Sequence, residues 1–394
     1  MSRAQAVKSS LPVTGVPMLD VSRQNDPLRD ELNAAIAEVC QSGTFVHGAA
    51  VARFEAAMAD FCGVDHAVGC ASGSDALLLA LMVLGVGPGD EVILPSFTFF
   101  ATAGAVWRLG ARPVFVDILP ETFNLDPAEV LYKLSSATKA IIPVHLFGQC
   151  AQMDEVQQIA NAARGVPIIE DAAQAIGAEF RGKRAGSIGA LGCFSFYPTK
   201  NLGGFGDGGL ITTNDAQLAD KLRVLRDHGQ RPRYYHHFVG LNSRLDSLQA
   251  AVLEVKLPKV DAWAQQRKVH AEKYAEAFKW RGLDGQIIAP SEAADCPSVW
   301  NQYTVRVTGG RRDALQQYLT ERKIGSAIYY PVPLHLQKCF AGLGHTDGSL
   351  PVTEQACREV LSLPVYPEMT EAEQEAVIES IASFCEQSKV RTAA

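Results

Sequence analysis

The stretch FSFYPTKNLGGFGDGG, residues 194–209, places a lysine between an aromatic run and a loop rich in glycine. Residues 194–196 are typical of a buried strand, and the proline and glycines that follow are typical of a turn and loop. Lys200 would therefore emerge from the end of a strand, where partial removal from water makes an amine easier to deprotonate. A nucleophilic amine needs that property. The alternative is a surface lysine near a turn, and the aromatic and glycine-rich surroundings argue against it.

An acidic pair follows another apolar run upstream. Glu170 and Asp171 come directly after Ile168-Ile169, and Gln174 follows them. A carboxylate at such a strand end could hold a protonated ring nitrogen, which a pyridine cofactor needs to act as an electron sink. Taken alone, the pair is explained more simply as acids at the N-terminus of a helix, where the helix dipole favours them.

A third segment, Ala71-Ser72-Gly73-Ser74-Asp75, consists of small residues that lead into a helical pattern. Backbone N–H groups can close on an anion at such a place, and the helix N-terminus favours negative charge. The segment is therefore a candidate phosphate site. An ordinary helix N-cap at Ser72 or Ser74 explains it equally well.

A fourth segment, residues 240–246, contains Asn242, Arg244 and Asp246. The planar guanidinium of Arg244 suits a carboxylate or a phosphate. The alternative is a helix-capping network in which Arg244 and Asp246 form a structural pair.

Short apolar runs alternate with longer helical stretches through the middle of the chain. Helical patterns such as residues 75–84 and 153–163 separate most of these runs. The candidate strands are residues 91–95, 113–118, 140–146, 167–170, 193–196 and 209–213. Several are apolar on both faces, as expected for strands covered by helices on each side. The alternation predicts an α/β fold with a largely parallel sheet.

The chain length of 394 residues favours more than one domain. We predict an N-terminal arm over residues 1–25, a large domain over 26–264 and a smaller α+β domain over 265–394. A long helical pattern over residues 258–280 precedes that smaller domain. A half-exposed strand at 302–307 and helices at 313–323 and 370–387 would form part of it.

Composition excludes several classes of function. The net charge is −7, and no dense basic run offers a surface for nucleic acid or an anionic membrane. The nine cysteines are scattered without Cys-x-x-Cys spacing, which argues against a disulfide framework and against a thiolate zinc site, and no other metal site is expected. With no apolar leader and no long apolar stretch, the chain is expected to be cytoplasmic.

Together the four segments resemble one family, the DegT/DnrJ/EryC1/StrS sugar aminotransferases, within the fold-type I pyridoxal-phosphate enzymes. The match extends from Leu19-Asp20 to residues 361–364, and residues 195–203 with 206–209 are its most specific part. The resemblance implies a large domain with a mostly parallel seven-stranded sheet between helices, and a smaller C-terminal α+β domain. It also implies pyridoxal 5'-phosphate, or its amino form, as the cofactor.

The resemblance further implies a role for individual residues. Lys200 would bind the cofactor as a Schiff base and act as the general acid and base. Asp171 would pair with the pyridine nitrogen, Gln174 would contact the ring hydroxyl and Phe99 would stack on the ring. The cofactor phosphate would be held by Gly73, Ser74 and Ser195, with Asn242 reaching in from a second subunit. Arg244, Tyr329 and His335 would face the substrate.

By the same resemblance, the enzyme would be a homodimer with shared active sites, and L-glutamate would be the amino donor. Residues 242–246 are similar to enzymes that aminate C-3 of a nucleotide-linked keto-sugar, for polysaccharide (lipopolysaccharide O-antigen) or glycoside biosynthesis. Residues 228–237 are similar to enzymes for UDP-3-keto-hexuronic acids, in which Arg244 would meet a substrate carboxylate. Residues 330–335 are similar to enzymes for dTDP-3-keto-6-deoxyhexoses, so both acceptors stay open.

Two positions depart from the family pattern and bear on the sugar. Tyr329 stands where relatives commonly have a histidine, and Ala49 replaces a common proline after Gly48. Amination at C-4 and an aminocyclitol acceptor remain alternatives. A sugar dehydratase of this family would carry histidine in place of Lys200, and a non-catalytic regulator would show degraded cofactor residues, which this chain does not.

Overall fold

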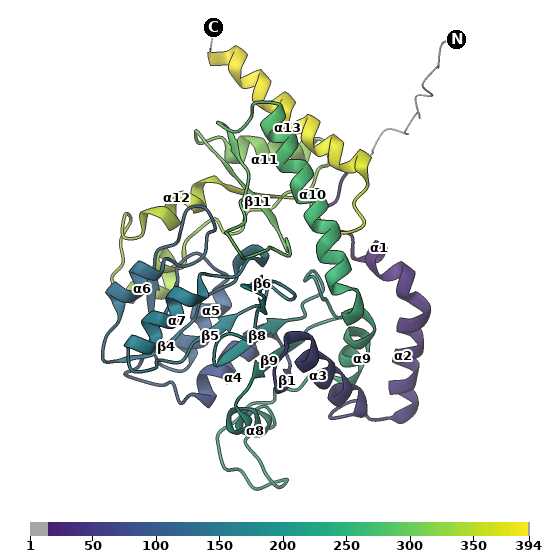
Figure 1. The fold of residues 1–394 in the computed structure, drawn as a ribbon, viewed down its shortest axis with the longest axis vertical. Helices are drawn as coiled ribbons and strands as arrows, with labels where there is room; N and C mark the ends of the chain where they lie inside the picture. The colour runs from purple at the N-terminus through teal and green to yellow at the C-terminus, as the bar shows by residue number, and fades with distance from the viewer. Residues whose placement is uncertain (1–14, 393–394) are drawn as a thin grey trace.

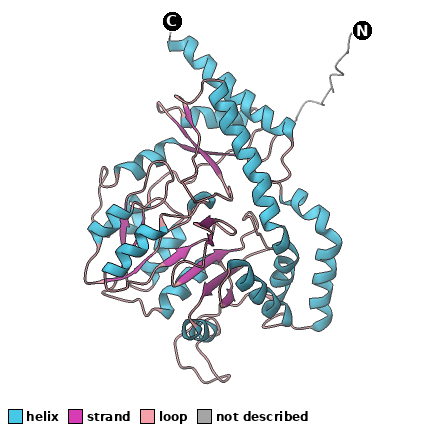
Figure 2. Ribbon diagram, in the orientation of Figure 1, coloured by secondary structure: helices cyan, strands magenta, loops and turns pink. Residues whose placement is uncertain are grey.

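The computed structural model describes residues 15–392. Most of the predicted N-terminal arm lies outside these residues, and its described part includes the short helix α1 (Val21–Asn25). Helices and strands then alternate through the middle of the chain, as Figure 2 shows. Within residues 15–392, no helix is both long and apolar enough to cross a bilayer.

The larger part of the molecule is an α/β assembly (Figure 1). Its strands are β1 (His66–Cys70), β2 (Glu91–Pro95), β3 (Arg112–Val116), β4 (Thr138–Ile141), β5 (Ile169–Asp171), β6 (Glu179–Phe180), β7 (Lys183–Arg184), β8 (Leu191–Ser195) and β9 (Gly209–Thr213). Its helices are α2 (Arg29–Ser42), α3 (Ala49–Cys62), α4 (Gly73–Val83), α5 (Phe100–Arg108), α6 (Pro127–Lys133), α7 (Met153–Ala162), α8 (Ala216–Leu225) and α9 (Ser247–Lys256).

Two sheets stand where one seven-stranded sheet was expected. The first has the order β3-β2-β4 with parallel neighbours, and the second has the order β1-β9-β8-β5. Isolated parallel bridges, Ile141 with Ile168 and Val144 with Asp171, lie between them. The α/β class is therefore observed, but the sheet is not continuous.

The expectation of a largely parallel sheet holds for part of the second sheet. β5 is parallel to β8, whereas β9 is antiparallel to both β8 and β1. The chain passes from β8 to β9 through the glycine-rich loop and not through a crossover helix, and parallel neighbours need such a crossover. The loop that carries Lys200 therefore reverses the strand direction.

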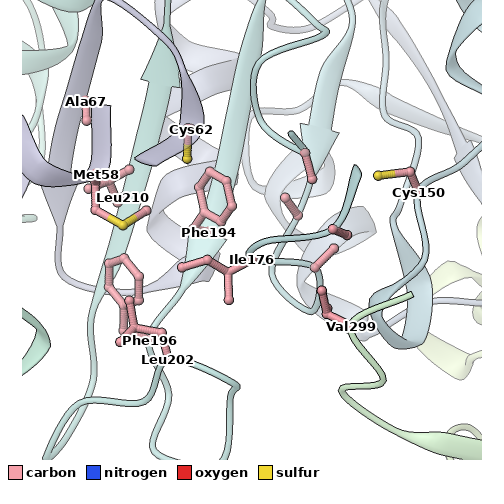
Figure 3. Packing of buried hydrophobic residues seen from close by; sticks show 14 of the residues in the cluster. Met58, Cys62, Ala67, Cys150, Ile176, Phe194, Phe196, Leu202, Leu210 and Val299 are labelled. Carbon is pink, nitrogen blue, oxygen red and sulfur yellow. The ribbon is translucent and has the colours of Figure 1, made fainter. Parts of the chain in front are cut away.

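Helices cover both faces of the second sheet. Along β8, Cys193 packs in one core cluster with residues of α4, α5 and α8, while Phe194 packs in the other with residues of α3, α7 and α9. Successive side chains of a strand point to opposite faces, so this alternation requires apolar cover on each side. Figure 3 shows Phe194, Met58 and Leu210 on the α3 side.

Several strand predictions are confirmed. β2 and β9 have the bounds expected from the sequence, whereas the run 140–146 forms a strand only to Ile141. Pro143 lacks a backbone N–H and cannot continue the ladder. β1 was not predicted, although its residues are buried.

A second core forms toward the C-terminus. It contains β10 (Ile287–Ile288), β11 (Tyr303–Val307) and β12 (Val360–Leu363), with α11 (Arg312–Glu321) and α13 (Glu371–Thr392). The helix α12 (Pro351–Glu359) packs in a separate cluster with Phe97 and Phe147. The long helix α10 (Val260–Trp280) joins the two cores: Val260 packs in the first, and Tyr274 and Phe278 pack in the second. In Figure 1, α10 runs from α9 to α13. The expected domain boundary after residue 264 falls inside this helix.

Candidate active site

A cavity of about 530 Å³ opens where β5 and β8 end and α4 begins. Ligands of open α/β sheets bind at this place, outside the carboxyl ends of strands. The residues that line the cavity are Ser72, Gly73, Ser74, Leu77, Thr98, Phe99, Ala101, Val144, Asp171, Ala173, Gln174, Ser195, Tyr197, Thr199, Lys200, Asp207, Gln302, Tyr329 and Tyr330. Eight of the residues that the sequence singled out are among them.

The N-terminus of α4 forms one end of the cavity. Ser72 is the N-cap, and its hydroxyl accepts a hydrogen bond from the Asp75 N–H at 3.1 Å. A Cβ atom on Gly73 would lie 2.6 Å from the Cβ of Ser195, so only glycine lets the strand end approach the helix so closely. Helix N–H groups and the Ser74 and Ser195 hydroxyls together suit a phosphate.

Asp171 ends β5 and is buried. Its Oδ2 accepts a hydrogen bond from the Thr102 hydroxyl at 2.8 Å, and its Oδ1 accepts one from the Ala173 N–H at 3.3 Å. Burial raises the pKa of the carboxyl, and both hydrogen bonds oppose that rise. A buried carboxylate that needs a cationic partner suits a protonated ring nitrogen.

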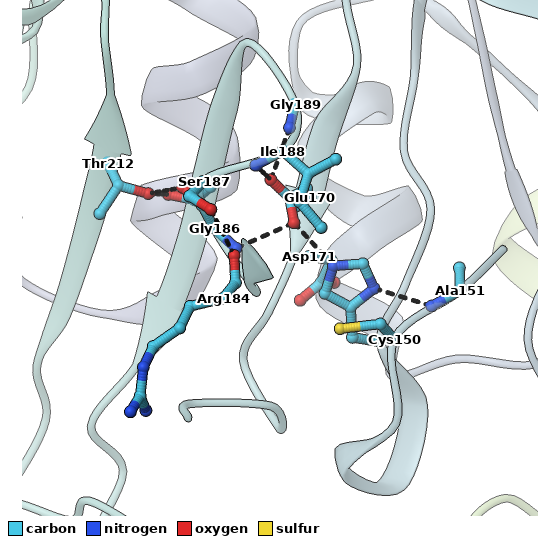
Figure 4. Close-up of polar contacts among 12 residues, drawn as sticks. Cys150, Ala151, Glu170, Asp171, Arg184, Gly186, Ser187, Ile188, Gly189 and Thr212 are labelled. Atoms are coloured by element: carbon cyan, nitrogen blue, oxygen red, sulfur yellow. Dashed lines mark hydrogen bonds and ion pairs between the residues drawn. The ribbon is translucent and has the colours of Figure 1, made fainter. Parts of the chain in front are cut away.

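Glu170, the acid next to Asp171, has a structural role. Glu170 accepts hydrogen bonds from the N–H groups of Gly186, Ile188 and Gly189 and contacts the His145 ring at 2.9 Å. Figure 4 shows this buried network, which fixes the turn before β8. Adjacent strand residues point to opposite faces, so one acid of the pair reaches the cavity and the other does not.

Lys200 lies in the turn after β8, where its backbone N–H donates to the Tyr197 carbonyl at 2.9 Å. Burial lowers the pKa of its ammonium group to about 8, and the charge of Asp171 works against that shift. A large fraction of the amine is therefore neutral at slightly alkaline pH. A nucleophilic lysine requires this state.

Aromatic rings and an amide complete the cavity wall. Gln174 accepts a hydrogen bond from the Phe147 N–H at 2.8 Å and donates one to the Tyr330 hydroxyl at 3.2 Å. The rings of Phe99 and Tyr330 lie 6.3 Å apart, and the Phe99 side chain is exposed to the cavity. Tyr329, expected at the substrate, also lines the wall.

Three expected site residues lie elsewhere. Asn242 and Arg244 line an adjoining recess that shares Asp207 with the cavity. The Arg244 guanidinium pairs with Asp227 at 2.7 Å and not with Asp246, the partner considered from the sequence.

The third is His335, whose ring is buried. It contacts the Ser96 hydroxyl at 2.7 Å and the Glu354 carboxylate at 3.2 Å. His335, expected at the substrate, is therefore not among the residues that line the cavity.

Other cavity residues were missed from the sequence. Thr98 and Thr102 lie four residues apart around the start of α5, with their hydroxyls 3.1 Å apart, and Thr102 supports Asp171. The sequence offered no local signal for this pair, because Thr98 precedes α5 and the two residues therefore do not lie on one helix. The sequence indicates no individual role for Tyr330, and it predicts Gln302 only as part of a strand.

The donor set fits pyridoxal phosphate. A buried amine, a buried carboxylate and a helix N-terminus with two hydroxyls face one cavity that is large enough for a small cofactor. These groups match an aldehyde, a ring nitrogen and a phosphate in turn. The fold and the site therefore define a pyridoxal-phosphate-dependent enzyme.

Comparisons with known proteins agree. The model of the DegT/DnrJ/EryC1/StrS aminotransferase family matches residues 26–382, and the chain belongs to this family. It is 50% identical to a protein of Geobacillus stearothermophilus described as a pleiotropic regulatory protein, over 94% of this chain and 98% of that one. It is 45% identical to the dTDP-3-amino-3,4,6-trideoxy-alpha-D-glucose transaminase of Streptomyces venezuelae, over 94% of this chain and 96% of that one.

Solved structures extend the likeness to the fold and the cofactor. The crystal structure of S. venezuelae DesV matches with a TM-score of 0.91 at 44% identity, covering 95% of this chain and 99% of that one. The crystal structure of NtdA from Bacillus subtilis, with bound cofactor PMP, matches with a TM-score of 0.88 at 32% identity. The match covers 95% of this chain and 86% of that one. The protein is a pyridoxal-phosphate-dependent sugar aminotransferase.

Proposed function

We propose that the protein transfers the amino group of L-glutamate to the C-3 keto group of a nucleotide-linked sugar. The candidate acceptors are a UDP-3-keto-hexuronic acid and a dTDP-3-keto-6-deoxyhexose. Support comes from relatives: the S. venezuelae transaminase is named for a dTDP-3-amino sugar, and a Pseudomonas aeruginosa protein, 42% identical over 89% of this chain and 95% of that one, is named UDP-2-acetamido-2-deoxy-3-oxo-D-glucuronate aminotransferase.

The observation that carries the proposal is that Lys200 and Asp171 line one cavity, although they come from different strands. Bound pyridoxal phosphate would supply the electron sink for transamination. Asp171 would hold the ring nitrogen in its protonated form, and Ser74 and Ser195 would hold the phosphate. The Nζ of Lys200 would anchor the cofactor and then, in each half-reaction, move the proton between the reacting carbon of the bound substrate and the cofactor.

The recess beside the cavity supports a shared active site. Asn242 and Arg244 line it, and exposed apolar side chains including Phe45, Tyr234 and Val239 lie on nearby segments of the chain. In a homodimer such a surface would be covered, and Asn242 could reach the cofactor phosphate of the other subunit. Arg244 would then meet the acceptor, exchanging Asp227 for a substrate carboxylate.

The test is the visible absorbance of the purified protein before and after L-glutamate. Wild type should lose its cofactor band on addition of L-glutamate and regain it with 2-oxoglutarate. Lys200→Ala, which removes the anchoring amine, should show neither change. A band that is indifferent to glutamate, or normal turnover by Lys200→Ala, would contradict the assignment.

The acceptor is identified in a second step with the glutamate-treated enzyme. UDP- and dTDP-linked 3-keto sugars, a 4-keto sugar and a keto-inositol are compared by recovery of the visible band. Recovery with a 3-keto nucleotide sugar, and none with the free sugar, supports the proposal. Equal or better recovery with the 4-keto sugar or the keto-inositol would replace it.

A further inference from the structure

Lys256 is a buried lysine outside the cavity wall. It is the last residue of α9, its side chain is fully shielded from solvent, and its Nζ donates a hydrogen bond to the Gly203 carbonyl at 2.6 Å. Burial lowers the pKa of this ammonium group to about 8, although the nearby Glu368 favours its charged form. An ammonium group is costly to bury, and an apolar side chain could fill the same space. Because burying the ammonium group is costly, its hydrogen bond to the Gly203 carbonyl indicates a role for Lys256 beyond filling space.

That contact falls on the loop that carries Lys200. The loop is held on both sides: the Asn201 side chain donates to the Val299 carbonyl at 2.9 Å, and the Phe205 N–H donates to the Gln249 side chain at 2.7 Å. Gln249 and Lys256 are seven residues apart on α9, and two turns of helix bring them to the same face. This one helix face therefore holds the loop at Gly203 and at Phe205.

Gly203 transmits the contact to Lys200. A Cβ atom on Gly203 would lie 2.2 Å from the carbonyl oxygen of Pro198, so the two backbones touch. Lys200 sits inside the turn that this contact closes, and its own N–H bonds to Tyr197. A displacement of Gly203 therefore moves the turn that contains Lys200.

We propose that Lys256 is a positioning residue for Lys200, whose ammonium group holds the Gly203 carbonyl and thereby keeps the Lys200 amine inside the cavity and away from water. The proposal rests on the assignment of Lys200 as the lysine that binds the cofactor. It goes beyond that assignment because Lys256 touches neither the cavity nor any group expected to react.

The consequence is a change in the protonation of Lys200. The titratable groups that share its cavity are Asp171, Asp207, Tyr197, Tyr329 and Tyr330. Asp171, Tyr329 and Tyr330 lie outside the loop that contains Gly203, whereas Tyr197 and Asp207 flank Lys200 on that loop and would move with it. Burial is the main cause of the lowered pKa of Lys200, so a loosened loop that admits water should raise that pKa toward its ordinary value of 10.5.

The experiment measures how fast pyridoxal phosphate attaches covalently to the cofactor-free full chain, by absorbance, as a function of pH. Wild type should show a midpoint near pH 8, the pKa of Lys200. In Lys256→Met the midpoint should rise by about one unit, which lowers the attachment rate at neutral pH about tenfold. Lys256→Arg, which keeps a cationic donor, should show a midpoint close to that of wild type.

Lys221→Met is the matched control. Lys221 also donates to a backbone carbonyl at 2.9 Å, but that carbonyl belongs to Val83 at the end of α4 and not to the Lys200 loop. Its loss should leave the midpoint unchanged. Deuterium exchange gives a second readout: peptides over residues 197–206 should exchange faster in Lys256→Met than in wild type or Lys221→Met. Lys256→Gln serves for both measurements if Lys256→Met does not fold.

The outcomes separate the two assignments. A wild-type midpoint near pH 8 with the same midpoint and exchange in Lys256→Met and Lys256→Gln overturns the role of Lys256 alone. Covalent attachment to Lys200→Ala at the wild-type rate overturns the role of Lys200 and, with it, the proposal. A midpoint shift shared by Lys221→Met would mark a general loss of stability and also overturn the positioning role.

Discussion

Asp171 illustrates how one reactive group depends on a side chain from another element. The carboxylate ends β5, but its hydrogen-bonding hydroxyl belongs to Thr102 of α5, 69 residues earlier in the chain. This bond fixes one carboxylate oxygen and leaves the group directed at the cavity. The sequence identified Asp171 through the strand that precedes it, whereas nothing near Thr102 in the chain pointed to its role.

Thr102→Val should lower kcat about tenfold and should also lower stability, because the buried Asp171 carboxylate loses a hydrogen bond. The valine keeps the shape of the side chain and removes a hydrogen bond to a charged group, worth about 1.5–3 kcal/mol. Steady-state kinetics with saturating donor would measure the loss. Thr102→Ser, which keeps the hydroxyl, should remain close to wild type. Full activity in Thr102→Val would show that Asp171 needs no support from α5.

At the scale of elements, the start of α4 must come very close to the end of β8. Gly73 lies where a side chain would collide with Ser195, and Gly209 lies where one would collide with the Ser72 backbone. Glycine at these positions lets the first turn of α4 face the place expected for the cofactor phosphate. The glycines therefore set the geometry of the phosphate site, and Ser74 and Ser195 supply its hydroxyls.

Gly73→Ala should weaken pyridoxal-phosphate binding at least about tenfold, because the new methyl group separates α4 from β8 and misplaces the phosphate donors. Titration of the cofactor-free protein, followed by absorbance, would measure this affinity. Gly87→Ala is the control, since a Cβ there meets no atom within 4 Å. Equal affinity for wild type and Gly73→Ala would exclude a phosphate site at this helix end.

A second pair of elements, α1 and α13, is joined by an ion pair. Arg23 donates to both carboxylate oxygens of Glu373, at 2.9 and 2.8 Å, and Thr370 donates to the same carboxylate. Burial alone would raise the pKa of Glu373, but the hydrogen bonds from Arg23 and Thr370 outweigh it and lower that pKa to about 2. The folded state therefore favours the ionised carboxylate.

This pair should stabilise the fold above pH 4.5, the ordinary pKa of glutamate, and the contribution should be lost as the pH falls toward 2. The sign follows from the lowered pKa, because the unfolded chain binds the proton first. Urea unfolding across this range should show a steeper loss of stability for wild type than for Glu373→Gln. Parallel pH profiles would mean that the pair contributes nothing measurable.

At the scale of the whole molecule, the expected cofactor residues divide between two places. Lys200 and Asp171 line the cavity, while Asn242 lies in the adjoining recess. If one chain supplied its whole active site, Asn242 would be expected to line the cavity, but it is exposed in the recess. The proposed homodimer would account for the division, since each recess would complete the cavity of the other chain.

Mixed dimers test this arrangement. Lys200→Ala and Asn242→Ala, each weakly active or inactive alone, should regain up to about a quarter of wild-type activity when mixed under conditions that exchange subunits. Half of the dimers would then be mixed, and each would hold one intact site. No recovery, despite subunit exchange verified with tagged chains, would mean that each chain supplies its own Asn242.

Much of the α/β class and of the reactive centre could be predicted from short-range patterns. β2 and β9 were visible as apolar runs between turn residues, and Lys200 and Asp171 were visible because each follows such a run. Residues at the carboxyl ends of neighbouring strands gather at one edge of a sheet, so their common cavity also followed. These features depend on local periodicity and on the residue types that end a strand.

Contacts between distant segments were decided only in the tertiary structure. His335 belongs to a motif that resembles a substrate contact, yet its partner Ser96 is 239 residues away in sequence, and packing against it withdraws the ring from the cavity. A structural pair of Arg244 with Asp246 was the alternative considered from the sequence, but Arg244 pairs with Asp227 instead. The sequence assigned no role to Lys256, whose bond to Gly203 depends on how α9 packs against the Lys200 loop. Such partners depend on how helices and strands pack, which local chemistry does not specify.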